Sequence, residues 1–143
     1  MFVKIFLINA VCTLFMTGLI WFVQLVQYPG FTSLDPPSFL QFHYSHVYRI
    51  AWLVIPVMVA ELATSIILVV AYELFFDINL IGLALLLLIW ASTFALQMPI
   101  HRKLREETDL KLIKKLIFSN WIRTLAWSLK SALSIYGLML LIP

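Results

Sequence analysis

Four long apolar runs constrain the fold of this chain more than any other feature. They cover residues 5–26, 50–70, 78–96 and 122–142 of the sequence. Each run reaches or approaches the roughly 20 residues that an α-helix needs to cross a ~30 Å hydrocarbon layer. Because a chain in lipid must satisfy its own backbone hydrogen bonds, these runs are predicted to be transmembrane helices. The sequence therefore predicts an all-α integral membrane protein, a four-transmembrane-helix up-down bundle.

The composition agrees with a membrane protein and excludes an ordinary soluble domain. The chain is 63% hydrophobic and 12% charged, whereas soluble domains are roughly 45–50% apolar and about 25% charged. Its length suits one membrane domain over residues 1–143, with helices expected over 4–27, 38–72, 78–98 and 119–142. The first run is longer than the apolar core of a cleavable signal peptide, so we expect it to stay as the first helix.

The connection between the third and fourth runs is predicted to contain a further helix. Pro99 is expected to end the third helix and to begin a new one. Apolar residues then recur at helical spacing among many charged ones: Leu104, Leu110, Ile113, Leu116 and Ile117. This pattern predicts an amphipathic surface helix over residues 100–117, lying on the membrane between helices three and four.

Basic residues are strongly biased toward one end of the predicted bundle. Eight of them lie at the end shared by the two long connections: Arg49, Arg102, Lys103, Arg105, Lys111, Lys114, Lys115 and Arg123. Only Lys4 lies at the other end, and Lys130 falls inside the fourth helix. Since cytoplasmic loops carry the excess of Lys and Arg, we expect both termini to lie outside the cytoplasm. Such a basic surface suits anionic membrane lipid, and no nucleic-acid partner is expected.

Polar side chains are predicted to gather at the same end. The up-down order brings together the end of helices one and three and the start of helices two and four, which carry Gln24, Gln27, His43, His46, Arg49, Gln97, His101, Asn120 and Arg123. We expect these residues to form a pocket that opens toward the cytoplasm.

Two ionisable groups lie deeper. Glu61 lies about 16 Å beyond Ile50 at 1.5 Å per residue, and Lys130 lies at a similar depth beyond Asn120. Charged groups near the centre of a bilayer usually pair with one another or line water. We therefore expect Glu61 and Lys130 to meet across the bundle. The alternative is that Lys130 extends its ammonium toward an interface while a protonated Glu61 bonds to a hydroxyl.

The three histidines of the chain also fall at the pocket end. His43 and His46 are three residues apart and can share a helix face, and His101 follows Pro99. Imidazoles from two helices are a common ligand set for iron, copper or zinc, and haem is a further cofactor to consider. The other interpretation is that they are interfacial hydrogen-bonding residues or act in acid–base catalysis.

Several short motifs carry a resemblance to known proteins. The segments VQYPGF, FHYSHVYRI, PVMVAEL, LQMPIHRKL and NWIRTLAWSLKS together resemble a widespread group of uncharacterised bacterial four-helix membrane proteins. More distantly, the chain is similar to the anthrone-oxygenase-like family of small membrane proteins. Pro99 and Arg123 fit positions typical of that family, whereas His101 stands where the family commonly has asparagine. The resemblance implies a four-helix fold with a polar pocket, oxidation of an apolar aromatic, and a place in a bacterial inner membrane.

Three classes of function fit these features, and a membrane oxidoreductase or oxygenase acting on a hydrophobic small molecule is favoured. His101, Arg123, Glu61 and Lys130 are the candidate catalytic residues. The candidate substrate-binding residues are Arg49, Gln97, Asn120, Trp127 and Gln24. Arginines in a partly dry pocket are suited to holding an oxyanion.

The other two classes use the same residues differently. A proton-coupled carrier would use Glu61 and Lys130 as a relay and would require a homo-oligomer, since four helices are few for alternating access. In a non-enzymatic binding or assembly subunit, the polar core would only fix the arrangement of the helices.

Overall fold

The computed structural model describes residues 1–141, and almost all of them are helical. The first membrane helix consists of α1 (Phe2–Phe22), the π-helix η1 (Val23–Gln27), α2 (Tyr28–Gly30) and the 3-10 turn η2 (Phe31–Ser33). The second is α3 (Pro36–Ala71). The third consists of α4 (Phe76–Ser92), the π-helix η3 (Thr93–Gln97) and α5 (Met98–Lys103), and the fourth is α6 (Leu110–Leu141). These four segments, Phe2–Ser33, Pro36–Ala71, Phe76–Lys103 and Leu110–Leu141, are long and apolar enough to cross a membrane.

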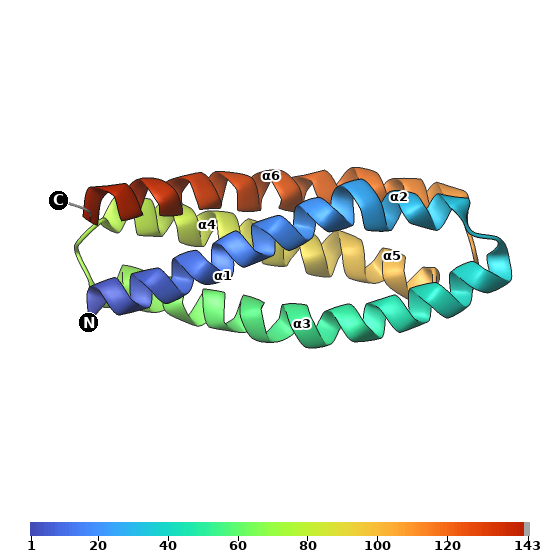
Figure 1. The fold of residues 1–143 in the computed structure, drawn as a ribbon, viewed down its shortest axis with the longest axis horizontal. Helices are drawn as coiled ribbons and strands as arrows, with labels where there is room; N and C mark the ends of the chain where they lie inside the picture. Colours follow the sequence, from blue (N-terminus) through green and yellow to red (C-terminus); the bar gives the residue numbers. More distant parts are fainter. Residues whose placement is uncertain (142–143) are drawn as a thin grey trace.

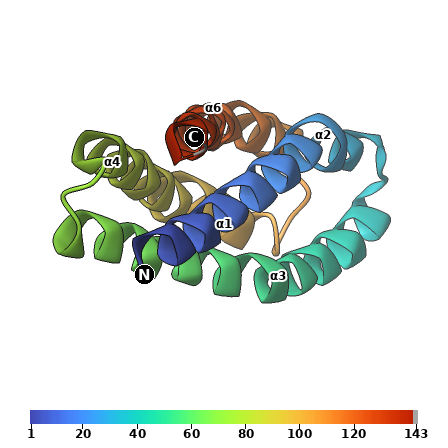
Figure 2. The same cartoon turned by 60° about the vertical axis from the view of Figure 1, so that its left-hand side comes forward.

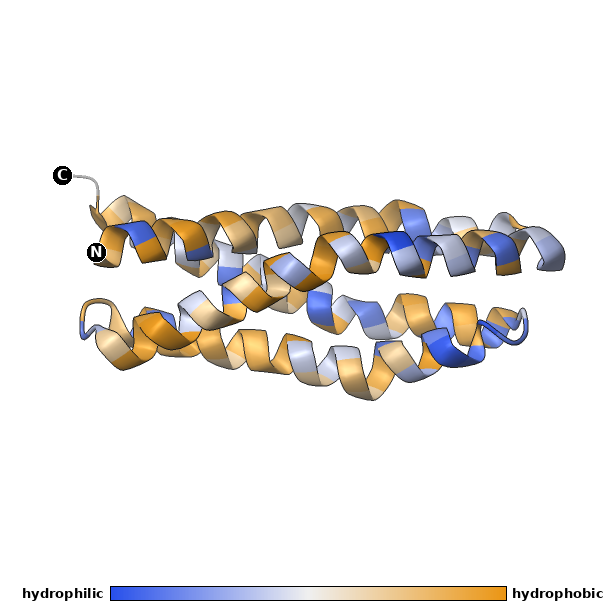
Figure 3. Ribbon diagram, turned by 90° about the horizontal axis from the view of Figure 1, so that it is seen from below, coloured by the Kyte–Doolittle hydropathy of each residue, from blue (hydrophilic) through white to orange (hydrophobic). Residues whose placement is uncertain are grey.

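The four helices form an up-down bundle with both termini at one end (Figure 1). The helix α1 packs against α3 and α6, and α4 packs against the same two helices. As a result α3 and α6 face each other across the diagonal, as the rotated view shows (Figure 2). Hydrophilic residues concentrate at the end opposite the termini (Figure 3). The predicted all-α, four-helix membrane fold is thereby confirmed.

Residues 100–117 differ from the prediction, because they do not form a separate surface helix. Residues 100–103 complete α5, and α6 already begins at Leu110, where Asp109 Oδ1 accepts a hydrogen bond from the Lys111 amide at 2.7 Å. The apolar residues Leu104, Ile113 and Leu116 are fully buried in the main core of the bundle. Their amphipathic pattern therefore reflects packing on the other helices, not a helix resting on lipid.

The first and third membrane helices share a local feature that the sequence analysis did not predict. The two π-helical segments occupy residues 23–27 and 93–97, at equivalent positions of the first and third helices. Identical residues recur at the same offset: Asn9 and Asn79, Gln27 and Gln97, Pro29 and Pro99, Leu34 and Leu104. The first and third membrane helices therefore share a local pattern, a π-helical segment followed by a proline.

Proline explains why a π-helix occurs twice. Pro29 and Pro99 each lie two residues after the end of a π-helical segment. A proline inside a helix has no N–H to donate, and its ring clashes with the carbonyl of the residue four positions earlier. Widening the preceding turn relieves that clash, and such π-bulges often occur at functional sites. Here both widened turns carry polar residues toward α6, among them Gln24, Thr93 and Gln97.

The shape of α3 opens space inside the bundle. Asp35 Oδ2 caps this helix by accepting a hydrogen bond from the Ser38 amide at 3.3 Å, and Pro56 lies within the helix. Pro56 cannot donate to the carbonyl of Trp52, which weakens the helix at that turn. Figure 1 shows α3 bowed outward, its middle farthest from α6. The large cavity described below lies under this bow.

Close packing between α1 and α6 at the terminal end gives a test of the fold. A Cβ atom added to Gly137 would lie 2.5 Å from Cζ of Phe6, whereas one added to Gly18 would have no neighbour within 4 Å. We expect Gly137→Ala to lower the free energy of unfolding by about 1–3 kcal/mol through overpacking. Gly18→Ala, the matched control, should be neutral or stabilising. Thermal unfolding in detergent checks both, and equal stability of the two variants would contradict this packing.

Candidate functional site

Glu61 and Lys130 form a buried ion pair at the centre of the bundle, as the sequence predicted. Lys130 Nζ lies 2.8 Å from Glu61 Oε1, and the two side chains are 2% and 0% exposed. The pair joins α3 to α6 across the diagonal of the bundle. Burial of this kind is tolerated only when the remaining hydrogen-bonding capacity of both groups is satisfied.

That capacity is satisfied by residues of α1 and α6. Lys130 Nζ also donates to Asn9 Oδ1 at 3.1 Å and to Thr13 Oγ1 at 2.6 Å, so all three ammonium protons are used. Glu61 Oε1 accepts from Thr13 Oγ1 at 2.7 Å, and Oε2 accepts from Trp127 Nε1 at 3.2 Å. We name these five residues the ion-pair cluster. Its complete hydrogen bonding is typical of a structural centre.

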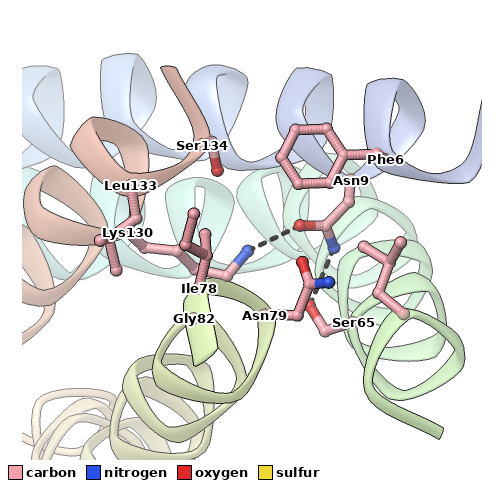
Figure 4. A pocket seen from close by; sticks show the side chains of 10 residues that line it. Phe6, Asn9, Ser65, Ile78, Asn79, Gly82, Lys130, Leu133 and Ser134 are labelled. Atoms are coloured by element: carbon pink, nitrogen blue, oxygen red, sulfur yellow. Dashed lines mark hydrogen bonds between the residues drawn. The ribbon is translucent and has the colours of Figure 1, made fainter. Parts of the chain in front are cut away.

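A small polar cavity adjoins the ion-pair cluster on the side of the chain termini (Figure 4). It has a volume of about 20 Å³ and is lined by Lys130, Asn9, Ser65, Asn79 and Ser134 together with apolar side chains. This is room for about one water molecule, and the polar lining suits one. The cavity is therefore too small for an organic ligand.

A second cavity, of about 550 Å³, lies on the other side of Trp127 under the bow of α3. Its volume falls in the roughly 300–1,000 Å³ range of ligand sites. One end is polar and is lined by Tyr28, His46, Thr93, Gln97, His101, Arg102, Arg105 and Arg123. The other end is apolar and is lined mainly by Met16, Leu19, Ile20, Val54, Met58, Trp90 and Trp127. We call this space the large cavity; it has the form of a site for an amphipathic molecule.

Arg123 is the dominant charge of the polar end. It is only 8% exposed, and among the described residues its hydrogen-bond partners are all neutral. Nε donates to Asn120 Oδ1 at 2.9 Å and Nη2 donates to the same oxygen, while contacts to Thr93 Oγ1 and Tyr28 Oη are long, at 3.4 Å each. Asn120 is held in turn by donating to Gln24 Oε1 at 2.8 Å. No carboxylate of residues 1–141 forms a salt bridge with Arg123.

Tyr28, His101 and His43 form a hydrogen-bonded chain that begins at Arg123. Tyr28 Oη lies 3.1 Å from His101 Nε2, and His101 Nδ1 lies 2.9 Å from His43 Nε2. Because Tyr28 Oη accepts from Arg123, its own proton is directed at His101, and the network then assigns a proton to Nδ1 of each histidine. His43 Nδ1 is buried and has no hydrogen-bond partner among the described residues. The hydrogen-bonded chain thus links the large cavity to His43.

The predicted three-histidine metal site is not formed. His43 and His101 bond to each other, and no group of three or more His, Cys, Asp or Glu side chains within residues 1–141 could hold a metal ion. His46 instead packs its ring against Phe31 and Tyr28, with ring centroids 5.5 and 6.4 Å apart. Metal ligands must all direct a lone pair at one point about 2.0–2.3 Å away. Among the described residues, the three histidines therefore do not form a ligand set for iron, copper or zinc.

The structure separates the other predicted site residues into three places. Gln97, Trp127 and Arg123 line the large cavity, while Gln24 and Asn120 are buried behind Arg123 and hold it. Arg49 is exposed on α3 and does not line the large cavity. Glu61 and Lys130 also lie outside its lining, and they reach it only through the Trp127 indole.

Sequence reasoning missed Tyr28, Thr93, Arg102 and Arg105 as cavity residues. Tyr28 is the most consequential, since it contacts both Arg123 and His101. It lies one helical turn after Gln24 and directly before Pro29, so its spacing offered a signal. The π-helical turn that points Thr93 at Arg123 has no comparable signature in the sequence.

No protein-family model, curated protein or solved structure matches this chain.

The ion-pair cluster makes a prediction about stability. Lys130→Met leaves the Glu61 carboxylate buried without its cation, and breaking such a pair costs roughly 3–5 kcal/mol of the free energy of unfolding. Lys130→Met combined with Glu61→Gln should recover much of that loss. Lys4→Met, at an exposed lysine of α1, is the matched control. Thermal unfolding in detergent measures all variants, and a single substitution as mild as the control would contradict a structural ion pair.

Proposed function

We propose that this protein is a membrane enzyme of the oxidoreductase or oxygenase class, which takes a hydrophobic substrate with an acidic oxygen or carbon into the large cavity. The observation that carries the proposal is the position of Arg123, a buried guanidinium without an anionic partner among the described residues. It stands at the junction of an apolar cavity and a hydrogen-bonded acid–base chain. The basic end of the bundle faces the cytoplasm in this proposal, with both termini outside.

The chain's own residues support removal of a proton from the bound substrate. A proton passed to Tyr28 Oη moves on as the tyrosine proton passes to His101 Nε2 and the His101 proton passes to His43 Nε2. Arg123 stabilises the negative charge that then develops on the substrate oxygen. Positioned acid–base groups contribute about 10²–10⁴ in rate, and one oxyanion-stabilising donor contributes about 10²–10³.

The oxidative half of the proposal rests on the resemblance to the anthrone-oxygenase-like family. An electron-rich anion of an apolar substrate is a suitable reductant for dioxygen, which dissolves readily in the apolar part of a membrane. Because the described residues provide no fitting metal site, the residues named here act on the proton and on the charge alone.

A carrier function finds less support in the geometry. All three protons of the Lys130 ammonium are engaged, and both carboxylate oxygens of Glu61 accept hydrogen bonds. Releasing a proton from this cluster requires breaking several buried hydrogen bonds at once. A binding protein without chemistry would use the same large cavity, so the experiment must separate binding from turnover.

The proposal predicts substrate oxidation that depends on Tyr28 and His101. Membranes containing the protein are incubated with a lipid extract of the host cell under ¹⁸O₂, and apolar products that gain the label are sought by mass spectrometry. We expect Tyr28→Phe and His101→Ala to lower product formation by about 10²-fold or more, because each breaks the proton chain. Tyr48→Phe, at an exposed tyrosine of α3, is the matched control and should keep wild-type turnover.

Elemental analysis and a visible absorption spectrum of the purified protein accompany this assay. Product formation that is equal in the wild type and in His101→Ala would contradict the proton chain. Stoichiometric metal or haem that is lost in His101→Ala would contradict the metal-free account of the site.

A further inference from the structure

The large cavity opens sideways toward lipid between α3 and the third membrane helix. Ile55 of α3, Phe94 of η3 and Met98 of α5 all line the cavity. They are nevertheless 57%, 54% and 45% exposed, so they form the rim of an opening. All three are apolar and lie within membrane-spanning segments. A ligand can therefore enter from the bilayer without passing through water.

The charges of the large cavity select the ligand. Arg123 is buried at the polar end, while Arg102 and Arg105 are exposed at its mouth near the end of α5. A guanidinium has five N–H donors, and Arg123 makes four hydrogen bonds within the protein, two of them long. One N–H is therefore free, and two more are held only by the long contacts to Thr93 and Tyr28. A planar monoanion such as a carboxylate can accept two parallel bonds from the guanidinium when it replaces one of these long contacts.

The shape of the large cavity selects the rest of the ligand. On α3 the lining extends from His46 to Met58, a distance of roughly 18 Å along the helix axis at 1.5 Å per residue. Its side chains away from the arginines are mainly aliphatic or methionine, which adapt to a flexible chain. The polar end lies toward the polar end of the bundle and the apolar end lies toward the middle of the membrane. A single-chain lipid in the adjoining leaflet already has this orientation.

We propose that the ligand of the large cavity is a long-chain carboxylic acid, which enters from the bilayer between α3 and η3–α5 and binds Arg123 through its carboxylate. This proposal goes beyond the proposed function. The acid binds already ionised and gives no proton to Tyr28, so it is a ligand of the same cavity and not the molecule that is oxidised. Arg102 and Arg105 attract the head group at the mouth, and Trp127 closes the apolar end.

The test measures binding without turnover. The protein in phosphatidylcholine nanodiscs is titrated with hexadecanoic acid, methyl hexadecanoate and hexadecyl phosphate at a pH where the acid is ionised, and bound ligand is counted by native mass spectrometry. We expect the wild type to prefer the acid over the ester. Arg123→Gln should weaken acid binding roughly 10- to 100-fold, the range expected for losing a charge-assisted hydrogen bond, and should leave the ester unchanged.

Matched variants keep the result interpretable. Arg49→Gln removes an exposed arginine outside the cavity and should bind the acid like the wild type. Arg123→Lys restores the charge and should recover part of the preference for the acid, which separates charge from folding. Ile55→Trp should slow association by narrowing the opening, whereas Ile67→Trp, at an exposed isoleucine elsewhere on α3, should not.

Several results would overturn the proposal. Equal affinity of the wild type for the acid and the ester would show that the ligand's charge does not contribute to binding. An unchanged preference for the acid in Arg123→Gln would show that Arg123 does not bind the carboxylate. Tighter binding of hexadecyl phosphate would assign the cavity to a phosphate-bearing lipid instead. Acid-selective binding without any labelled product would contradict the proposed enzyme but not this ligand. Labelled product together with equal binding of acid and ester would contradict this ligand but not the proposed enzyme.

Discussion

The structure depends on the rule that a charge inside a membrane-embedded bundle must be paired or solvated. Glu61 and Lys130 satisfy it together, 2.8 Å apart, at the point where α3 and α6 face each other. Their partners Asn9, Thr13 and Trp127 come from α1 and α6, so the ion-pair cluster ties three of the four membrane helices in one register. The same cluster separates the one-water cavity from the large cavity.

Arg123 shows the opposite solution to the same constraint. It is buried almost as deeply as the ion pair, yet its partners among residues 1–141 are amide and hydroxyl groups. A guanidinium held without an anion is costly unless an anion arrives with the ligand. The hydrogen-bonded chain from Tyr28 to His43 begins at this point. In the proposed function, one bound molecule therefore meets both the charge of Arg123 and the acid–base groups. The paired Lys130 thus lies where three helices are held together, and Arg123, which has no anionic partner among the described residues, lies beside the large cavity.

Much of the fold and the central ion pair could be predicted from the sequence, because membrane helices follow strict rules of length and polarity. The four membrane helices and the meeting of Glu61 with Lys130 followed from apolar run lengths and from depth counted in residues. The prediction of a surface helix was wrong because an amphipathic pattern does not show whether Ile113 and Leu116 face lipid or other helices. The prediction of a three-histidine metal site was wrong because the topology brings His43 and His101 near each other without directing their lone pairs at one common point. The large cavity depends on the bow at Pro56 and on two π-helical turns, which change side-chain direction in ways that periodicity does not show.

The most direct test of the central claim, that Arg123 completes its coordination with an anion from the membrane, is the mass of whatever stays bound when the protein is extracted. Protein taken from its membrane in polymer discs, without detergent or added ligand, is ejected intact in a mass spectrometer. The account predicts a bound, anionic, single-chain molecule in the wild type that is absent from Arg123→Gln and retained in Arg49→Gln. A wild-type protein that carries no anionic molecule, or carries the same molecules as Arg123→Gln, would contradict it.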